Sequence, residues 1–227
     1  MKSYAIIVAG GIGNRMQSLL PKQFLDLSGK AILWHSIEIF HSYDPSIEII
    51  VSMHPAYIDY WKKECAKNNY SIEHRIVEGG KTRFHSVQNA LTKVTEPGFV
   101  AIHDAARPLI SQKFVSTLFE EAMTNENCIP VLPVTESIRK ISDDKNIPLQ
   151  REKYFFVQTP QIFYSGILLK AYQQTYQPSF TDDASVVENM GYSIHTSEGL
   201  ANNFKVTTLK DILLAELLLS GSTKTDH

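Results

Sequence analysis

The pattern that most constrains the fold is an alternation of short apolar runs with amphipathic segments between residues 4 and 134. The apolar runs predict buried strands, and segments with apolar residues three and four positions apart predict helices. This order is typical of a three-layer α/β sandwich around a mainly parallel sheet, in which ligands bind beyond the carboxyl ends of the strands. We expect strands at Tyr4–Val8, Ile47–Met53, Ile72–Val77, Phe99–His103 and Ile129–Val134, and helices at Ile32–His41, Ala56–Asn68, Ser86–Val94 and Lys113–Thr124.

The alternation stops between Thr135 and Phe156. Ser142–Asn146 is a strong turn signal, and the flanking segments Ser137–Ile141 and Glu152–Val157 could pair as a hairpin. Two interpretations stay open: an extruded hairpin arm of the kind that two subunits exchange, and a disordered surface insertion. Further on, the pattern predicts a helix at Gly166–Tyr176, another from Thr181 or Asp182 to before Gly191, a strand at Ser193–Ser197 and a last helix from Thr208, whose spacing to Asp211 fits a capping box.

A glycine-rich stretch directly follows the first predicted strand. It is Ala9-Gly10-Gly11-Ile12-Gly13-Asn14-Arg15-Met16, and it continues to Pro21-Lys22-Gln23. Glycines let backbone N–H groups approach a phosphate without interference from a Cβ atom. Arg15 and Lys22 add two positive charges beside those groups. We therefore expect a site for a polyanion, most simply a nucleotide triphosphate.

Better-known catalytic motifs do not fit the chain. A dinucleotide fingerprint requires glycine or alanine at its third small position, where this chain has Met16. A P-loop requires Ser or Thr after Gly-Lys, and Gly29-Lys30 is followed by Ala31. The sequence has no HExxH motif and no GxSxG elbow, which argues against a zinc protease and a serine hydrolase.

Two other segments place polar residues where a parallel sheet would bind a ligand. His103-Asp104-Ala105-Ala106-Arg107-Pro108 closes a predicted strand. Asp104 there could hold Mg²⁺ or a ligand hydroxyl and Arg107 a phosphate, although an internal Asp104–Arg107 ion pair would explain both residues equally well. The segment Gly79–Ser86 is a glycine turn whose N–H groups and serine hydroxyl could contact a base, and its Arg83 could equally anchor the turn.

Charge and cysteine content narrow the classes of function. Lys and Arg number 22 against 24 Asp and Glu, so the net charge of -2 provides no general attraction to nucleic acid or to a membrane. Cys65 and Cys128 are the only cysteines, which argues against a disulfide framework and favours a cytoplasmic location. A chain of 227 residues fits one domain over residues 1–227, with residues 135–156 as its arm.

Together these motifs make the chain resemble the 2-C-methyl-D-erythritol 4-phosphate cytidylyltransferases of the non-mevalonate isoprenoid pathway. Six blocks follow one another in the family's order between Tyr4 and about Leu219, and His103–Pro108 is the most specific of them. The others are Ala9–Met16, its continuation Pro21–Leu25, Gln158–Gln161, Thr181–Ser185 and Asn203–Thr207.

The resemblance implies a Rossmann-like nucleotidyltransferase that uses Mg²⁺ or another divalent cation and works as a homodimer. Such an enzyme makes 4-diphosphocytidyl-2-C-methyl-D-erythritol and pyrophosphate from CTP and the polyol phosphate. The catalytic residues it implies are Arg15, Lys22 and Lys205, with Asp104 as a candidate metal ligand. It assigns the nucleotide to Ala9, Gly10, Gly11, Gly13, Gly79, Gly80, Ser86 and Asp104, and the polyol phosphate to Asp104, Arg107, Arg151, Thr159, Thr181 and Lys205. Arg151 and Thr159 would serve the pocket from the partner subunit.

The chain departs from the family pattern near the cytosine turn. Lys81 stands where members often have an acidic residue, and His85 stands where aspartate is common. The nearest alternative is a ribitol-5-phosphate cytidylyltransferase, which tends to carry Ser-Val in place of Ala105-Ala106. A non-catalytic nucleotide-binding protein of the same fold is the second alternative, and the presence of both phosphate clusters argues against it.

Overall fold

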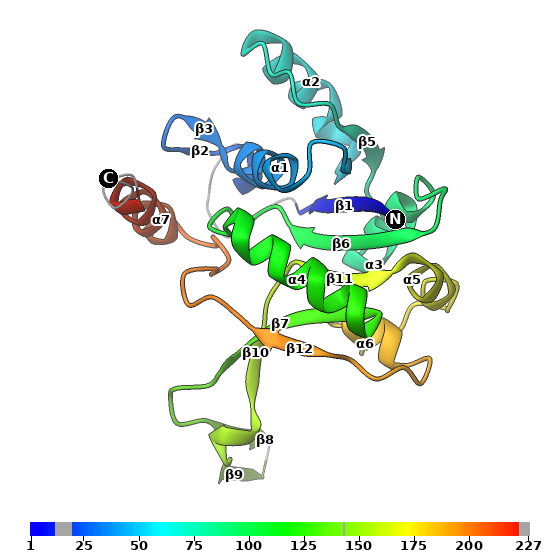
Figure 1. The fold of residues 1–227 in the computed structure, drawn as a ribbon. Coiled ribbons are helices and arrows are strands. Elements are labelled where there is room, and N and C mark those ends of the chain that lie inside the picture. Colours follow the sequence, from blue (N-terminus) through cyan, green and yellow to red (C-terminus); the bar gives the residue numbers. More distant parts are fainter. Residues whose placement is uncertain (12–19, 143, 223–227) are drawn as a thin grey trace.

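The computed structural model describes residues 1–11, 20–142 and 144–222. Its centre is an eight-stranded mixed sheet in the order β10–β7–β11–β6–β1–β4–β5, with β12 also paired to β7 (Figure 1). The strands of this sheet are β1 (Lys2–Ala9), β4 (Glu48–Met53), β5 (Arg75–Glu78), β6 (Gly98–Asp104), β7 (Asn127–Pro133), β10 (Phe155–Val157), β11 (Gln161–Tyr164) and β12 (Thr196–Glu198).

Helices cover both faces of the sheet, which confirms the three-layer α/β architecture (Figure 1). The side chains of β1 alternate between the two layers, because successive residues of a strand point to opposite faces. Ala5 and Ile7 pack with one set of helices, and Tyr4 and Ile6 pack with the other. The first set is α1 (Ile32–Tyr43), α2 (Ile58–Lys67) and α4 (Gln112–Asn125), and the second is α3 (Arg83–Leu91), α5 (Ser165–Ala171) and α6 (Asp183–Glu188).

Strand register brings the carboxyl ends of the central strands together. β1 lies parallel to both β4 and β6, and Val8 is level with Asp104 while Ala9 is level with Met53. The glycine-rich stretch after β1 and the acidic residue that ends β6 therefore leave the sheet at the same edge. This is the edge at which α/β sheets bind ligands.

The structure adds a strand that periodicity does not predict. β11 lies between β6 and β7 and is antiparallel to both, so β7 runs parallel to β6. Its sequence follows the Thr159-Pro160 peptide and contributes two fully buried apolar side chains, Ile162 and Phe163. Four residues are too few for a clear period, and their pairing with two distant strands is decided by tertiary contacts.

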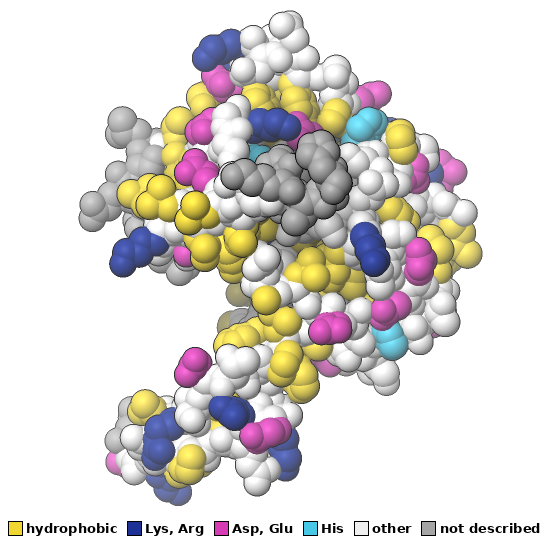
Figure 2. Space-filling view, turned by 60° about the vertical axis from the view of Figure 1, so that its left-hand side comes forward, with side chains coloured by type: hydrophobic (Ala, Val, Ile, Leu, Met, Phe, Trp, Pro, Cys, Tyr) yellow, Lys and Arg dark blue, Asp and Glu magenta, His cyan; other side chains and the backbone are white. Residues whose placement is uncertain are grey.

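The hairpin arm is present, but its strands differ from the expected ones. β8 (Arg139–Ser142) pairs with β9 (Lys145–Pro148), whereas the expected partner segment forms β10 and pairs with β7. Local pairing is favoured because β8 and β9 are almost adjacent in sequence, so closing the loop between them costs little entropy. All residues of both strands are exposed, and the arm projects from the body as a separate lobe (Figure 2).

Some element boundaries also differ from the expectations. α3 begins at Arg83, three residues before the expected Ser86, because the Thr82 side chain caps it by accepting a hydrogen bond from the His85 N–H. β5 begins at Arg75 instead of Ile72. The last helix, α7 (Leu209–Ser222), has the predicted cap: Thr208 and Asp211 exchange hydrogen bonds between side chain and backbone.

The remaining elements are short. They are the 3₁₀ turns η1 (Lys22–Phe24), η2 (Pro55–Tyr57) and η3 (Arg151–Lys153) and the strand pair β2 (Asp26–Leu27) and β3 (Lys30–Ala31). Within the described ranges, every helix is too short or too polar to cross a membrane.

Candidate active site

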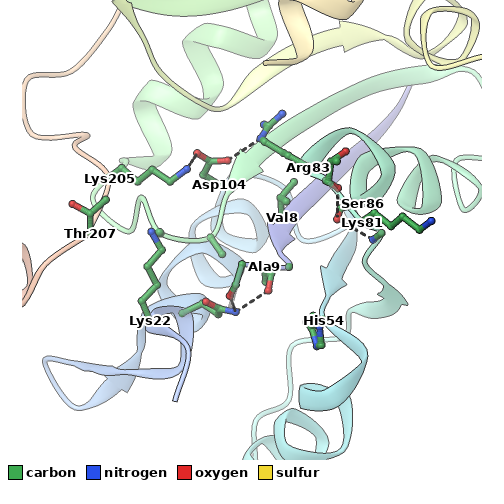
Figure 3. A pocket seen from close by; sticks show the side chains of 17 residues that line it. Val8, Ala9, Lys22, His54, Lys81, Arg83, Ser86, Asp104, Lys205 and Thr207 are labelled. Carbon is green, nitrogen blue, oxygen red and sulfur yellow. Dashed lines mark hydrogen bonds and ion pairs between the residues drawn. The ribbon is translucent and has the colours of Figure 1, made fainter. Parts of the chain in front are cut away.

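A cavity of about 670 Å³ lies at the carboxyl edge of β1 and β6 (Figure 3). Lys22, Lys205 and Thr207 lie on one side of it, Lys81 and Ser86 lie on the other, and Asp104 projects between them. The cavity therefore unites four of the six sequence blocks. The described residues that line it are Val8, Ala9, Gly10, Gly11, Lys22, Gln23, His54, Gly80, Lys81, Thr82, Arg83, Ser86, Asp104, Ala105, Ala106, Lys205 and Thr207.

The floor of the cavity is fixed by Gln23, which is almost fully buried. Its side-chain amide donates hydrogen bonds to the carbonyl oxygens of Ala9 at 2.7 Å and Gly11 at 3.1 Å. Both carbonyl oxygens therefore have a hydrogen-bond partner within the protein. The backbone at the end of β1 is held in one conformation before any ligand binds.

Lys22 and Lys205 are far apart in sequence, and the segment 205–207 brings them to the same side of the cavity (Figure 3). The Val206 N–H donates to the Ala106 carbonyl at 2.8 Å, and the Lys22 ammonium donates to the Val206 carbonyl at 2.9 Å. Asp211, in the cap of α7, accepts hydrogen bonds from the N–H and hydroxyl of Thr207. The cap of the C-terminal helix thereby anchors the irregular segment that carries Lys205 into the cavity.

The glycine turn before α3 is organised around Ser86. The Ser86 hydroxyl accepts the Gly80 N–H at 3.0 Å and donates to the Thr82 carbonyl at 3.0 Å. A Cβ atom on Gly80 would lie 2.3 Å from the Cβ of His85, which the backbone cannot accommodate without moving. The turn therefore requires glycine, and in this structure the serine hydroxyl is engaged in shaping it. The predicted contact of Ser86 with a base stays a prediction.

Asp104 is the electrostatic centre of the cavity. Its carboxylate lies 2.7 Å from the Lys205 ammonium and 3.2 Å from the Arg83 Nε atom, and Arg107 Nε is 3.9 Å away. Burial by itself would raise the pKa of the Asp104 carboxyl, but the charges of Arg83 and Lys205 outweigh it and hold this pKa well below its usual range. Asp104 is thus permanently ionised and cannot serve as a proton donor near neutral pH.

Arg83 is itself held by a second, deeper carboxylate. Its guanidinium forms two parallel hydrogen bonds to Asp183, at 2.9 and 2.7 Å, and Asp183 is fully buried. The Tyr172 hydroxyl donates to the same carboxylate at 2.6 Å. Bidentate arginine–carboxylate pairs have a fixed geometry, so Asp183 at the start of α6 orients the arginine that contacts Asp104.

A chain of hydrogen bonds behind the cavity supports the end of β6. Thr159 accepts the Asp104 N–H at 3.1 Å, and its hydroxyl lies 3.1 Å from His103 Nδ1. His103 Nε2 lies 3.0 Å from the Arg107 carbonyl, which can only accept a hydrogen bond, so Nε2 carries the proton and Nδ1 accepts from Thr159. Burial lowers the pKa of His103 to about 4, and the ring is therefore neutral.

The predicted substrate residues are not all brought to the cavity. Arg107 is adjacent to Asp104 but donates to the Asn203 carbonyl at 2.6 Å. Thr159 is buried, Thr181 is exposed outside the lining, and Arg151 lies on the arm, where it donates to the Thr135 carbonyl. Gly79 lies at the end of the turn without lining the cavity. Two further predicted residues, Gly13 and Arg15, lie outside the described residues.

The cavity also contains residues that the motifs did not assign to a ligand. Arg83, Lys81 and His54 line it. Arg83 has a recognisable signal, since a positive side chain in a glycine turn at a strand end is a candidate for an anion site. His54 has none, because its position depends on where η2 begins after β4.

The lining can accommodate a divalent cation together with a triphosphate. Asp104 is the single carboxylate among the described lining residues. Mg²⁺ is commonly held by one or two carboxylates and by substrate phosphates, and it keeps several waters. Because both oxygens of Asp104 already contact cations, the donor set fits a metal ion that is held mainly by the nucleotide.

Comparisons with known proteins point to one family. The family model described as 2-C-methyl-D-erythritol 4-phosphate cytidylyltransferase matches residues 3–221. A protein of that name from Bacteroides thetaiotaomicron is 44% identical over 219 residues, covering 96% of this chain and 100% of that protein. One from Porphyromonas gingivalis is 42% identical over 222 residues, covering 97% and 99%. The crystal structure of the Thermus thermophilus enzyme has a TM-score of 0.77 and 29% identity, covering 97% of this chain and 100% of that one.

Proposed function

The chain belongs to the 2-C-methyl-D-erythritol 4-phosphate cytidylyltransferase family, and we propose that the cavity around Asp104 is where its two substrates meet. The enzyme transfers a cytidylyl group from CTP to 2-C-methyl-D-erythritol 4-phosphate. The products are 4-diphosphocytidyl-2-C-methyl-D-erythritol and pyrophosphate, and the reaction belongs to the non-mevalonate route of isoprenoid biosynthesis.

The observation that carries the assignment of the site is its charge. Of the described residues that line the cavity, four are cationic, namely Lys22, Lys81, Arg83 and Lys205, and one is acidic, Asp104. The whole chain has a net charge of -2, so this excess of positive charge is local. It suits a reaction that brings a phosphomonoester dianion up to a nucleotide triphosphate.

Electrostatic repulsion is the main obstacle to this reaction. Each pair of unit charges about 4 Å apart costs ~1 kcal/mol in water and more in a site of lower dielectric constant. The acceptor phosphate is already ionised at neutral pH, so its oxygen attacks the α-phosphorus without a general base. In such transfers the protein mainly positions the reactants and stabilises charge.

The lysines take complementary roles in this proposal. Lys22, held beside the end of β1, faces the phosphates of CTP, and Lys205 lies at the junction between the α-phosphate and the acceptor. Asp104 keeps the Lys205 ammonium in place through their 2.7 Å contact. Arg15 completes the phosphate cluster on the strength of the family motif. Backbone N–H groups of Gly10 and Gly11 bind the nucleotide. The turn at Gly79 and Gly80 would contact it with other atoms, because its two N–H groups already donate to Met53 and Ser86.

Mg²⁺ would be held by the triphosphate and by Asp104. When bound, it would neutralise part of the phosphate charge and make pyrophosphate a better leaving group. The side chains of Lys22 and Lys205 would still be required, because a single divalent ion cannot balance both substrates.

The arm supports a further proposal, that the enzyme is a homodimer. Phe155, Phe156 and Val157 on β10 are 51%, 59% and 42% exposed, which is unusual for side chains of this kind. A partner subunit seated on them would bring its own arm close to this cavity, and Arg151 of the arm would then contact the polyol phosphate. Thr159 supports the site from behind, and Thr181 would complete the acceptor pocket. Both cysteines are free thiols, which fits a cytoplasmic enzyme.

A panel of lysine variants tests this site. Lys22→Ala and Lys205→Ala should each lower turnover with CTP and 2-C-methyl-D-erythritol 4-phosphate by roughly 100- to 1000-fold, because each removes a charge from the transition state. Lys113→Ala on the exposed side of α4 is the matched control and should retain wild-type turnover. Pyrophosphate release is measured for each protein, with ribitol 5-phosphate as a second acceptor. Near-normal turnover in both cavity variants would show that the reaction takes place elsewhere.

A further inference from the structure

Three side chains with metal-ligating atoms converge at a second place in the fold. Glu121 lies on α4, Cys128 lies near the start of β7, and His195 immediately precedes β12. The Cys128 Sγ atom is 3.5 Å from Glu121 Oε2, and His195 Nε2 is 3.0 Å from the same oxygen. All three ligand atoms lie within 4.8 Å of one another.

The framework around these side chains is fixed before any ion binds. The buried side chain of Asn127 accepts the His195 N–H at 2.8 Å and donates to the Ser193 carbonyl at 3.1 Å, and the Ile129 N–H donates to the His195 carbonyl. Ser197 donates its hydroxyl to the other oxygen of Glu121, at 2.8 Å. Hydrogen-bonded outer partners of this kind orient metal ligands in known sites.

We propose that Glu121, Cys128 and His195 form a binding site for Zn²⁺. Zinc takes sulfur at about 2.3 Å and nitrogen or oxygen at about 2.0–2.2 Å in a tetrahedron, which places its ligand atoms roughly 3.3–3.6 Å apart. The observed separations of 3.5 and 3.0 Å from Glu121 are close to that range. On binding, the Cys128 thiol releases its proton to solvent, and the thiolate and carboxylate then balance the charge of the ion.

The fourth ligand of the ion would be water. A cavity of about 610 Å³ opens beside the cluster and is lined by Glu121, Ser197 and their neighbours on β12. Solvent and the ion can therefore reach Glu121 from outside, whereas Cys128 is fully buried behind it. The resulting set has three protein ligands and one open position, which is typical of zinc. It contains a single thiolate, whereas iron–sulfur clusters are held by several cysteine thiolates.

This site is separate from the cytidylyltransferase cavity. Cys128 on β7 pairs with Ile162 on β11, and Ile162 pairs with Ala101 on β6. Cys128 therefore lies two strands away from β6, level with Ala101, which precedes Asp104 by three residues. None of the three ligands lines the substrate cavity. A bound ion would link α4 to β7 and β12. These elements lie at the end of the sheet that carries the arm (Figure 1). Its expected effect is on the stability of that edge.

Cobalt provides a direct test, because Co²⁺ bound by a thiolate gives a charge-transfer absorption band in the near ultraviolet. Untagged, reduced protein is titrated with Co²⁺ in the presence of excess Mg²⁺, which occupies sites built only from oxygen. We expect one equivalent to produce the band, and Zn²⁺ to abolish it by displacing cobalt. Cys128→Ser should lose the band, and Cys65→Ser, the same change at the other thiol, should keep it.

A second variant separates a metal site from a hydrogen-bond network. His195→Gln retains an N–H donor for Glu121 but removes the imidazole ligand. Its affinity for Zn²⁺, measured by competition with a chromophoric chelator, should fall by more than roughly 100-fold, beyond the range known for loss of an outer partner. Zinc should raise the melting temperature of the wild type and of Cys65→Ser but not of Cys128→Ser. Absence of the band in wild type, or its persistence in Cys128→Ser, would overturn the proposal.

Discussion

His103 shows how much a single buried side chain can determine at this site. It lies next to Asp104 in the chain, yet it is fully buried and takes no part in lining the cavity. Its neutral ring links the Thr159 hydroxyl to the Arg107 carbonyl. The histidine thus fixes the end of β6, while the acidic residue beside it faces the cavity.

This arrangement makes stability depend on pH in a defined direction. Burial lowers the pKa of His103 from 6.5 to about 4, so between these values the unfolded chain binds a proton that the folded one does not. The contribution is complete above pH ~6.5 and is lost as the pH falls towards ~4, by about 3 kcal/mol at most. Urea unfolding at a series of pH values should show this slope in the wild type.

The variant His103→Gln is the control for that slope. Glutamine retains a donor for the Arg107 carbonyl but does not titrate. Its unfolding free energy should therefore change less between pH 6.5 and 4 than that of the wild type, whatever its absolute stability. Equal slopes in the two proteins would mean that His103 is protonated in the folded state.

At the scale of one element, the turn before α3 shows why glycine occurs where it does. The turn runs from the end of β5 to the Thr82 cap, and Ser86 reaches back to bind the Gly80 N–H. The helix therefore starts close to the end of β1, and a Cβ atom on Gly10 would be 3.2 Å from the Ser86 hydroxyl. Close approach of these two backbones forms one wall of the cavity.

Gly80→Ala should disrupt this wall. The added methyl group would lie 2.3 Å from the Cβ of His85, so the turn must shift and the Gly80–Ser86 hydrogen bond is lost. We expect a loss of 1–3 kcal/mol of stability, the typical cost of overpacking, and a raised KM for CTP. Gly11→Ala, whose added Cβ has no atom of the described residues within 4 Å, is the control for stability. Calorimetry and initial-rate kinetics measure the two effects, and unchanged stability in Gly80→Ala would contradict the structure.

At the scale of the whole molecule, two runs of exposed apolar side chains stand out among the residues that the structure describes. One is β10 with its two phenylalanines, and the other is the outer face of α7, where Leu209, Leu213 and Leu217 are each more than 60% exposed. The first is continuous with β7 and with the arm, and it is the surface we assign to the partner subunit. Large exposed aromatic side chains are the residue type that dominates such interfaces.

Phe156→Asp tests the proposed dimer. Burying a carboxylate in place of an aromatic ring should weaken association by at least roughly 30-fold, which corresponds to the ~2 kcal/mol of an interface hot spot. The side chain is exposed in one subunit, so the fold should survive. Light scattering across a range of concentrations measures the association, and circular dichroism checks the fold. Lys63→Asp, an exposed position on α2 at the end of the sheet opposite β10, is the control. A wild type that is monomeric at every concentration would refute the proposal.

The sequence by itself determined the layered α/β class, most of the helices, and the placement of Lys22 and Asp104 after strands that end at the cavity. These features depend on local signals: apolar periodicity, helix caps such as Thr208, and the glycine, lysine and aspartate residues that follow strands. Periodicity and capping act over a few residues, so they can be read without knowing the fold. The family resemblance then connected the blocks.

Only the tertiary structure decided how those residues are used. It inserted β11 between β6 and β7, paired β8 with β9, and turned Ser86 and Thr159 into supports for their neighbours. It also joined Arg83 to Asp183 over 100 positions, and Glu121 to His195 over 74. Such partnerships arise from packing between segments that are distant in sequence. A hydroxyl, guanidinium or carboxylate has many possible hydrogen-bond partners, and it pairs with the one that burial brings within hydrogen-bond distance.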